Sequence, residues 1–569
     1  MIHFTRQKKV KYTNTDSKDD KSEVSLNSTG ILRNKFYVYA LIGVCVIFLV
    51  LKLMFLNPKV VWDESVYLGM GKYAYSQGQS GLWEMIRPLG LPLVTGFFWK
   101  LGQDNAMNQI VMSRIFSILI SLGCIIVTYL IAKKLFDKKH SMISALILVC
   151  TPIFFFYSSY ILTDHISTLF LMLSILFLFK DRYVFAGFFG GAAFWFKFTN
   201  ILYIIALLLF IIYKLIDKWI KNRKSHDKKS IFLFISKSIS DKNIKKYLYT
   251  IAITLLCIAA YFLSNYALYH EHYSVMDAIF RPYIDASSYS NNPYQNTVFS
   301  SAPLLYIFYY PFNIIFSHTY GLLIYIFVII YFWRYRKFIK KESKESHESH
   351  TLLLFIFFTY LLYLSTIPYK VDRFWITFLP FMAMYASFGI LWLFDNIDNK
   401  KFGKWHGYGK YIRIILIIVI IILFGIAIYK DAQVYKQNKS DTLYYNLYPA
   451  NQNLRNVEKY FDNHNITGPI LVTSPVFAAY SDKKFIGAYD VLNKNSLFVN
   501  DWESNTSFNA VAYMDSSIPC MKNDANCLDN KRKLQDMIKE KFIEKDSYIY
   551  DGSNITFFVK RISAQRVID

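Results

Sequence analysis

Two adjacent acids, Asp63 and Glu64, are the residues whose position most suggests chemistry. They lie in the stretch Val60–Pro92, which directly follows the first long apolar run, so they emerge where that run leaves a bilayer. The same stretch holds Arg87 and several Tyr and Trp residues. Charged side chains beside a membrane are costly, and a functional role is the default interpretation. We therefore expect this stretch to form one wall of an active site.

Other charged residues fall at the same end of later apolar runs. They come from distant parts of the chain and are Asp164, His165, Lys197, Asp277, Arg281, Lys370, Asp372 and Arg373. A carboxylate base with several cations suits displacement of a phosphate leaving group, because the acid takes up a proton while the cations hold the developing negative charge. The rings of Trp62 and Tyr67 are candidates for stacking on a sugar. The expected chemistry is nucleophilic transfer at a membrane surface.

The elements that must position these residues are membrane helices. The 569-residue chain is 54% hydrophobic and 18% aromatic. Its apolar runs of about 20 residues are long enough to cross a hydrocarbon core about 30 Å thick, and only helices satisfy their own backbone hydrogen bonds there repeatedly. We predict an all-α polytopic membrane domain with about eleven transmembrane helices. The expected spans are 36–56, 110–132, 141–159, 164–180, 183–198, 200–216, 247–268, 315–333, 351–368, 374–394 and 411–429.

The charge distribution predicts an orientation. The net charge of +24 comes from basic residues between the apolar runs, and no folded basic domain suited to nucleic acid is visible. The positive-inside rule places the N-terminus in the cytoplasm, and an odd number of spans places the C-terminus outside. Leu91–Leu101 is too short to span and is predicted as an interfacial helix of the first external loop. We expect a multi-pass protein of the cytoplasmic membrane that contacts the lipid bilayer and no nucleic acid.

Three regions follow from this pattern. Residues 1–35 are polar and predicted to be a disordered cytoplasmic terminus. Residues 36–430 form the transmembrane catalytic domain. Residues 431–569 lack a spanning run and are predicted to form a small extracytoplasmic α/β domain, with strands at Pro469–Thr473, Asn509–Met514 and Asn554–Lys560 and a helix at Arg532–Phe542. Cys520 and Cys527 close a short loop in this domain, and a non-reducing compartment favours a disulfide between them.

Several motifs in this order resemble the membrane-embedded GT-C glycosyltransferases. The motifs are WDESVY, RPLGLPLV, SRIFSILISL, YILTDHISTLFL and KVDRFWITFLPFMAMY. The most similar branch contains the protein O-mannosyltransferases and the lipid A aminoarabinose transferase. The resemblance covers roughly residues 36 to 395, and its specificity lies in the ordered set of motifs.

The resemblance implies an enzyme that takes a sugar from a polyprenyl-phosphate carrier on the extracytoplasmic side and inverts its anomeric carbon. It implies that Asp63 is the base or the acid that orients the acceptor, and that Asp164 is the second acidic position. Arg373 resembles the residue that binds the donor phosphate. The predicted site is completed by Glu64 among the catalytic acids, by Lys370, Arg87 and Lys197 among the phosphate-binding cations, and by His165, Trp62 and Tyr67 as lining residues. The acceptor is a protein, a glycan or a lipid.

Each of these residues also has a structural interpretation. Asp63 and Glu64 favour the first turn of a helix, and Asp164 follows Thr163 at a helix start. Arg373 and Lys197 are long enough to reach the interface from a helix end. Arg114, inside the second span, is interpreted as a structural pairing residue.

The sequence also bears on two other functions and on one metal site. A transporter or flippase of lipid-linked sugars predicts polar residues near the membrane midplane and inverted repeats, and neither is visible. A non-catalytic scaffold does not require Asp63, Asp164 and Arg373 to lie together. His270 and His272 share a face only in a strand, and no third ligand is evident, so no metal site is predicted. The sequence indicates no particular cofactor, and it is compatible with a bound divalent cation.

Overall fold

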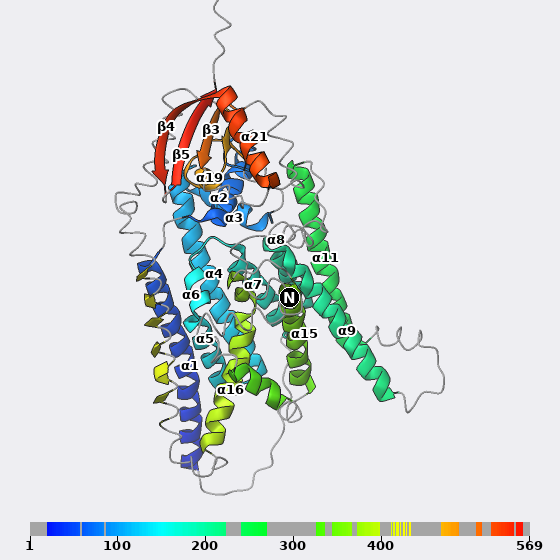
Figure 1. Ribbon diagram of the computed structural model, residues 1–569. Helices are drawn as coiled ribbons and strands as arrows, with labels where there is room; N and C mark the ends of the chain where they lie inside the picture. Colours follow the sequence, from blue (N-terminus) through cyan, green and yellow to red (C-terminus); the bar gives the residue numbers. More distant parts are fainter. Residues whose placement is uncertain are drawn as a thin grey trace, which may run out of the picture.

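The structure is a computed structural model of the chain. It describes residues 20–56, 60–84, 87–222, 241–269, 326–335, 344–366, 372–398, 468–488, 508–514, 525–550 and 553–560, together with single residues between 411 and 433. The fold is a bundle of apolar helices with a small mixed sheet at one end (Figure 1). This arrangement confirms the coarse fold class, a mostly helical chain with a small C-terminal mixed sheet.

Five of the described helices contain stretches long and apolar enough to cross a membrane. They are α1 (Asp20–Met54), α4 (Ala106–Leu135), α9 (Ile201–Asn222), α11 (Lys242–Tyr269) and α15 (Lys344–Thr366). Shorter apolar helices pack among them, namely α5 (Lys138–Cys150), α6 (Pro152–Tyr157), α7 (Thr163–Leu178), α8 (Tyr183–Phe196) and α16 (Leu379–Asp398). The chain is therefore a multi-pass membrane protein.

Two details differ from the predicted spans. The expected span 141–159 is divided between α5 and α6, because Pro152 stands at the first position of a new helix and cannot donate a hydrogen bond to continue the old one. At the other end of the chain, α1 begins at Asp20 and so includes residues that the composition predicts to be disordered. A helix already formed in the apolar segment extends at little cost, since adding a residue to a helix is easier than starting one.

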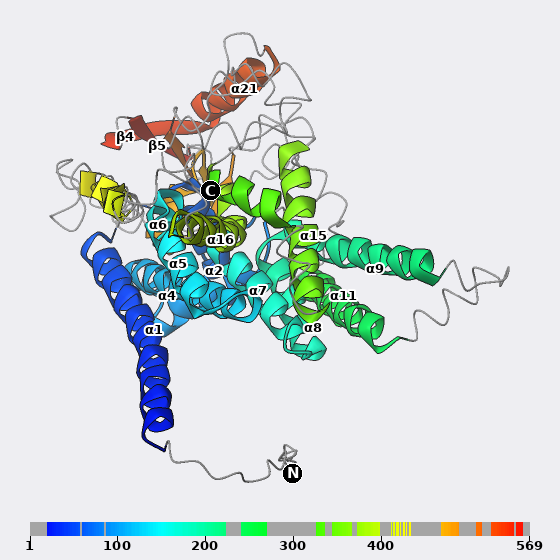
Figure 2. The same cartoon turned by 90° about the horizontal axis from the view of Figure 1, so that it is seen from below.

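The helices pack closely where small residues face each other. α8 lies against α7 and α11, and a Cβ atom at Gly187 would come within 2.6 Å of Ile253 Cβ, while one at Gly191 would collide with Cys257. Only glycine permits this approach of two helix backbones. α1 and the pair α9 and α11 lie at opposite sides of the bundle (Figure 2). The buried core lies between these sides.

The stretch between α1 and α4 contains two helices, α2 (Trp62–Tyr75) and α3 (Gly90–Leu101). α3 matches the helix predicted over Leu91–Leu101. No residue range was predicted for α2, and its first turn carries Asp63 and Glu64, in agreement with the structural interpretation of these two acids. The two helices contact each other, and a Cβ at Gly71 would lie 2.5 Å from Thr95 Oγ1.

The sheet has the strand order β2-β1-β3-β5-β4. Its strands are β1 (Ile470–Val472), β2 (Phe485–Gly487), β3 (Ala510–Met514), β4 (Phe542–Tyr550) and β5 (Ser553–Lys560). β1 pairs in parallel with β2 and β3, whereas β5 pairs antiparallel with β3 and β4. The predicted strands β1, β3 and β5 and the helix α21 (Ala525–Lys541) are confirmed, and β2 and β4 are additional.

The two faces of the sheet pack against different helices. Leu471 and Val511 face α21 and form a cluster with Leu534. Side chains that alternate with these, such as Ile470 and Ala512, belong to a second cluster that includes Tyr67 and Leu68 of α2. In Figure 1 the sheet lies directly over α2 and α3. The sheet therefore shares a hydrophobic core with α2 and α3.

Candidate active site

The carboxylate of Asp63 binds two guanidinium groups. Arg87 Nη2 donates to Oδ1 at 2.8 Å, and Arg373 Nη1 lies 2.5 Å from Oδ2. Arg373 is carried by η5 (Asp372–Thr377), a short helix that leads into α16. The three side chains are 19–22% exposed, so the cluster is reachable from solvent but largely enclosed.

These ion pairs set the protonation state of Asp63. Burial alone favours the neutral acid, but the charges of Arg87 and Arg373 hold the pKa of Asp63 well below its usual range. Burial acts to lower the pKa of Arg373, and the carboxylates of Asp63 and Asp164 outweigh it, so that this pKa is raised. All three groups are therefore ionised at neutral pH.

Arg87 is held by two further contacts. Its Nε donates to Glu84 Oε2 at 3.0 Å, and its guanidinium lies 5.7 Å from the ring centre of Tyr67. The phenol of Tyr67 in turn hydrogen-bonds with Thr163 at the start of α7. The predicted lining residue Tyr67 thus lies beside Asp63, and it joins α2 to α7.

A second ion pair lies next to the first. Lys197 Nζ is 2.6 Å from Asp164 Oδ1, where α8 ends and α7 begins. The same ammonium lies 5.0 Å from the ring of Phe374, the residue after Arg373. The charges of Asp164 and Arg373 also attract each other. Asp63, Arg373, Lys197 and Asp164 therefore form one cluster of alternating charge.

Glu64 has different surroundings from Asp63. Its side chain is fully buried, and its carboxylate accepts from Arg114 Nη2 at 3.1 Å, from Ile161 N at 2.7 Å and from Val61 N at 2.8 Å. Burial raises the pKa of this acid, and Arg114 opposes the shift. Val61 N is at the start of α2, so Glu64 makes the helix-start contact that was one interpretation of these acids. Arg114 is the structural pairing residue expected from its place in the span.

The remaining predicted residues are less central. Trp62 is half-buried at the first position of α2. His165 is buried with its ring 5.0 Å from that of Phe154, and its Nε2 has no hydrogen-bond partner within the described part of the chain. Lys370, the His270–His272 stretch, and the side chains of Cys520 and Cys527 lie outside the described residues. Among the described residues no three His, Cys, Asp or Glu side chains are grouped as a metal site would require.

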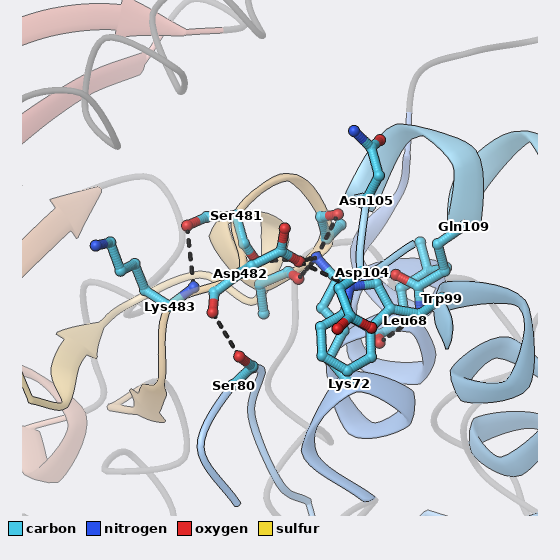
Figure 3. A network of polar contacts seen from close by, with 12 residues as sticks. Leu68, Lys72, Ser80, Trp99, Asp104, Asn105, Gln109, Ser481, Asp482 and Lys483 are labelled. Carbon is cyan, nitrogen blue, oxygen red and sulfur yellow. Dashed lines mark hydrogen bonds and ion pairs between the residues drawn. The ribbon is translucent and has the colours of Figure 1, made fainter. Parts of the chain in front are cut away.

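Sequence reasoning missed the residues that anchor α2. Lys72 is fully buried and donates to the carbonyl oxygens of Ala478, Ala479 and Ser481 (Figure 3). Gln109 of α4 donates to the carbonyls of Leu68 and Thr95 at 3.1 Å each. One signal was present, since Lys72 is the single cation in the otherwise apolar and small stretch 65–75.

The comparisons with known proteins place this fold. The aminoarabinose transferase ArnT from Cupriavidus metallidurans, solved with undecaprenyl phosphate, matches 92% of this chain and 98% of its own at a TM-score of 0.55 and 10% identity. The oligosaccharyltransferase AglB from Archaeoglobus fulgidus was solved with an inhibitory peptide and a dolichol-phosphate. It matches 94% of this chain and 75% of its own, at a TM-score of 0.52 and 12% identity. No curated protein sequence matches. The chain has the GT-C fold.

The sequence also matches a family. Residues 87–236 fit the family described as dolichyl-phosphate-mannose-protein mannosyltransferase. That range contains Arg87, Asp164 and Lys197, while Asp63 and Arg373 lie outside it and are brought to the cluster by the fold. The chain is thus a GT-C membrane glycosyltransferase that depends on a lipid-phosphate-linked sugar. The class predicted from the ordered motifs is confirmed.

Proposed function

We propose that this enzyme transfers a sugar from a polyprenyl-phosphate carrier to an acceptor outside the cytoplasmic membrane, with inversion of the anomeric carbon. The observation that carries the proposal is the cluster in which Asp63 binds both Arg87 and Arg373 beside the Asp164–Lys197 pair. It supplies a carboxylate for the acceptor and several cations for a phosphate. These are the two requirements of displacement at a glycosyl phosphate.

The transfer forms one bond and breaks one bond. The acceptor oxygen forms a bond to the anomeric carbon while the bond from that carbon to the phosphate oxygen breaks. The electron pair of the broken bond goes to the polyprenyl phosphate, whose added charge Arg373 stabilises. The acceptor proton goes to Asp63. Lys197, Arg87 and Lys370 are the further cations assigned to the phosphate.

Donor binding also changes the strength of the base. Three acids, Asp63, Glu84 and Asp164, balance the three cations Arg87, Arg373 and Lys197. A donor phosphate therefore competes with Asp63 for the guanidinium of Arg373. When Arg373 turns to the phosphate, Asp63 loses an ion pair, its pKa rises, and it becomes a better proton acceptor. Asp63 is then released for catalysis only when a donor is in place.

The orientation of the protein follows the positive-inside rule. We assign about eleven membrane helices, with the N-terminus in the cytoplasm and residues 431–569 as an extracytoplasmic domain. The sheet and α2, the helix that carries Asp63, lie at the same end of the bundle (Figure 1), so the proposed orientation puts both outside the membrane. A polyprenyl donor would reach the cluster from the bilayer. The acceptor, a protein, a glycan or a lipid, would approach beneath the sheet.

A deletion strain tests the proposal. Mass spectrometry of its surface glycans should show the loss of one sugar modification, and the wild-type gene should restore it. A copy carrying Asp63→Asn, at equal abundance in the membrane, should not restore it. Unchanged glycans in the deletion strain would contradict the proposed function.

A further inference from the structure

Three contacts join α2 to the C-terminal sheet domain, at the start, in the middle and at the end of the helix. At its start, Val60 N donates to the hydroxyl of Tyr480 at 3.1 Å. In its middle, a Cβ at Gly69 would lie 2.8 Å from Ala478 Cβ, so the two backbones are nearly in contact. At its end lies Lys72. The helix α19 (Val476–Tyr480) of the sheet domain therefore runs against the helix that carries Asp63.

Lys72 supplies the strongest of these contacts. Its buried ammonium binds the carbonyls of Ala478, Ala479 and Ser481 at 2.8–3.1 Å, and it lies 3.2 Å from Asp482 Oδ1. These carbonyls lie at the C-terminal end of α19, where the helix dipole stabilises a cation. A buried cation of this kind is held in one place, because every alternative position leaves its charge without hydrogen bonds. Lys72 thus fixes α2 against α19.

Asp482 and the loop after α2 complete the attachment. Trp99 Nε1 donates to Asp482 Oδ1 at 3.0 Å, and Ser80 Oγ donates to Asp482 O at 2.6 Å (Figure 3). Gly81 pairs in parallel with Lys484 and so extends the sheet beyond β2. Gly81 has a φ of 76°, and a Cβ there would collide with Gly69 O. Glycine is required at this position because the loop must pass so close to α2.

We propose that Lys72 is a positioning residue, through which the C-terminal sheet holds α2 and sets the place of Asp63. This inference rests on the proposed function and adds to it a role for the sheet domain in catalysis. Arg373 is held separately, because η5 contacts α6, α7 and α16. Loosening α2 should therefore displace Asp63 and leave the donor phosphate contact of Arg373 in place.

The test is steady-state kinetics of the purified full-length protein with a polyprenyl-phospho-sugar. Lys72→Met keeps the length of the side chain and removes its charge. It should lower kcat about 10- to 100-fold, the scale of a small misplacement of a catalytic group. The donor KM should stay within about twofold of wild type. Lys533→Met is the matched control, since Lys533 lies on the exposed face of α21 and pairs with Asp529.

A milder variant covers the case in which Lys72→Met does not fold. Asp482→Asn keeps an oxygen for Trp99 and loses the charge next to Lys72, and it should lower kcat in the same direction by a smaller factor. Unchanged kcat in the folded variant would overturn the proposal, as would a raised acceptor KM with kcat intact. Asp63→Asn is measured in parallel. If the wild-type protein shows no transfer from the polyprenyl-phospho-sugar, the proposed function fails; if wild type is active and Asp63→Asn is inactive while Lys72→Met has full activity, only the positioning role fails.

Discussion

Arg373 Nη1 lies 2.5 Å from Asp63 Oδ2, so the first turn of α2 is tied to η5 from the other half of the chain. The contact joins the two residues to which the ordered motifs assign the base and the phosphate ligand. Before a donor binds, the two partially neutralise each other. The proposed base and the proposed phosphate-binding cation are thus in contact, with their charges paired.

Asp63→Asn should abolish most of the transfer. The amide cannot accept the proton of the acceptor, and general-base catalysis is worth about 10²- to 10⁴-fold, so kcat/KM should fall by that factor. The measurement is transfer from a polyprenyl-phospho-sugar by detergent-purified protein. Asp104→Asn is the matched control, because Asp104 is an exposed acid that pairs with Lys100. Full activity of Asp63→Asn would refute its role as base.

Arg373→Gln should weaken binding of the sugar donor. A hydrogen bond to a charged group contributes about 1.5–3 kcal/mol, which corresponds to a rise of about 10- to 100-fold in the donor KM. Arg373→Lys should recover part of this loss, since an ammonium keeps the charge without the planar fork. Arg532→Gln, on the exposed face of α21, serves as control. A donor KM equal to that of wild type in Arg373→Gln would assign the phosphate to other residues.

Arg87→Gln should shift the acidic limb of the pH–rate profile towards neutral pH. An ordinary Asp has a pKa of about 3.9. In the folded protein the pKa of Asp63 lies below this value. Asp63 therefore keeps its negative charge and its ion pairs until the pH falls through its folded-state pKa. Removing one guanidinium raises that pKa, and protonation then begins at a higher pH.

The measurement for Arg87→Gln is kcat/KM between about pH 4 and pH 8 for the variant and for wild type. Lys100→Gln, which removes an exposed cation of α3, should have the wild-type profile. Coincident acidic limbs in Arg87→Gln and wild type would show that Arg87 does not control the titration of Asp63.

Arg114→Met should destabilise the protein. It leaves Glu64 fully buried without its cation, and breaking a buried ion pair in this way costs about 3–5 kcal/mol. The double variant Glu64→Gln with Arg114→Met should recover part of the loss, because the uncompensated charge is gone. Thermal unfolding in detergent is the measurement. Asp104→Asn should change stability by at most about 1 kcal/mol, as expected for an exposed pair, and a wild-type Tm in Arg114→Met would contradict the assignment.

Much of the membrane fold was predictable because it depends on local composition. An apolar run longer than the bilayer must be a helix, and basic residues mark its cytoplasmic end. The helices α7 and α8 therefore match the expected spans closely, while α4 and α15 contain most of theirs and begin earlier. The break at Pro152 was missed, and α2 had no predicted residue range. α2 contains two glycines and few long apolar side chains, so it is stable mainly because the sheet domain and α3 bury it.

The candidate site was predictable as a group and not as a set of pairs. Topology placed Asp63, Asp164, Lys197 and Arg373 at one membrane surface. Which cation meets which acid depends on distances of a few ångströms between helices, and these are fixed only when the side chains pack. The same limit explains why Glu64 and Asp63, adjacent in sequence, have opposite surroundings: neighbouring side chains on a helix point about 100° apart.

The sequence by itself determined that this is a polytopic membrane glycosyltransferase, because long apolar runs and an ordered set of motifs are properties of the chain. It also identified the charged residues that cluster beside α2. Only the tertiary structure decided that Glu64 is buried against Arg114, that Asp63 lies between two guanidinium groups, and that Lys72 fastens α2 to a sheet formed by the end of the chain. These are long-range contacts, whose partners are selected by packing and electrostatics and leave no periodic signal in the sequence.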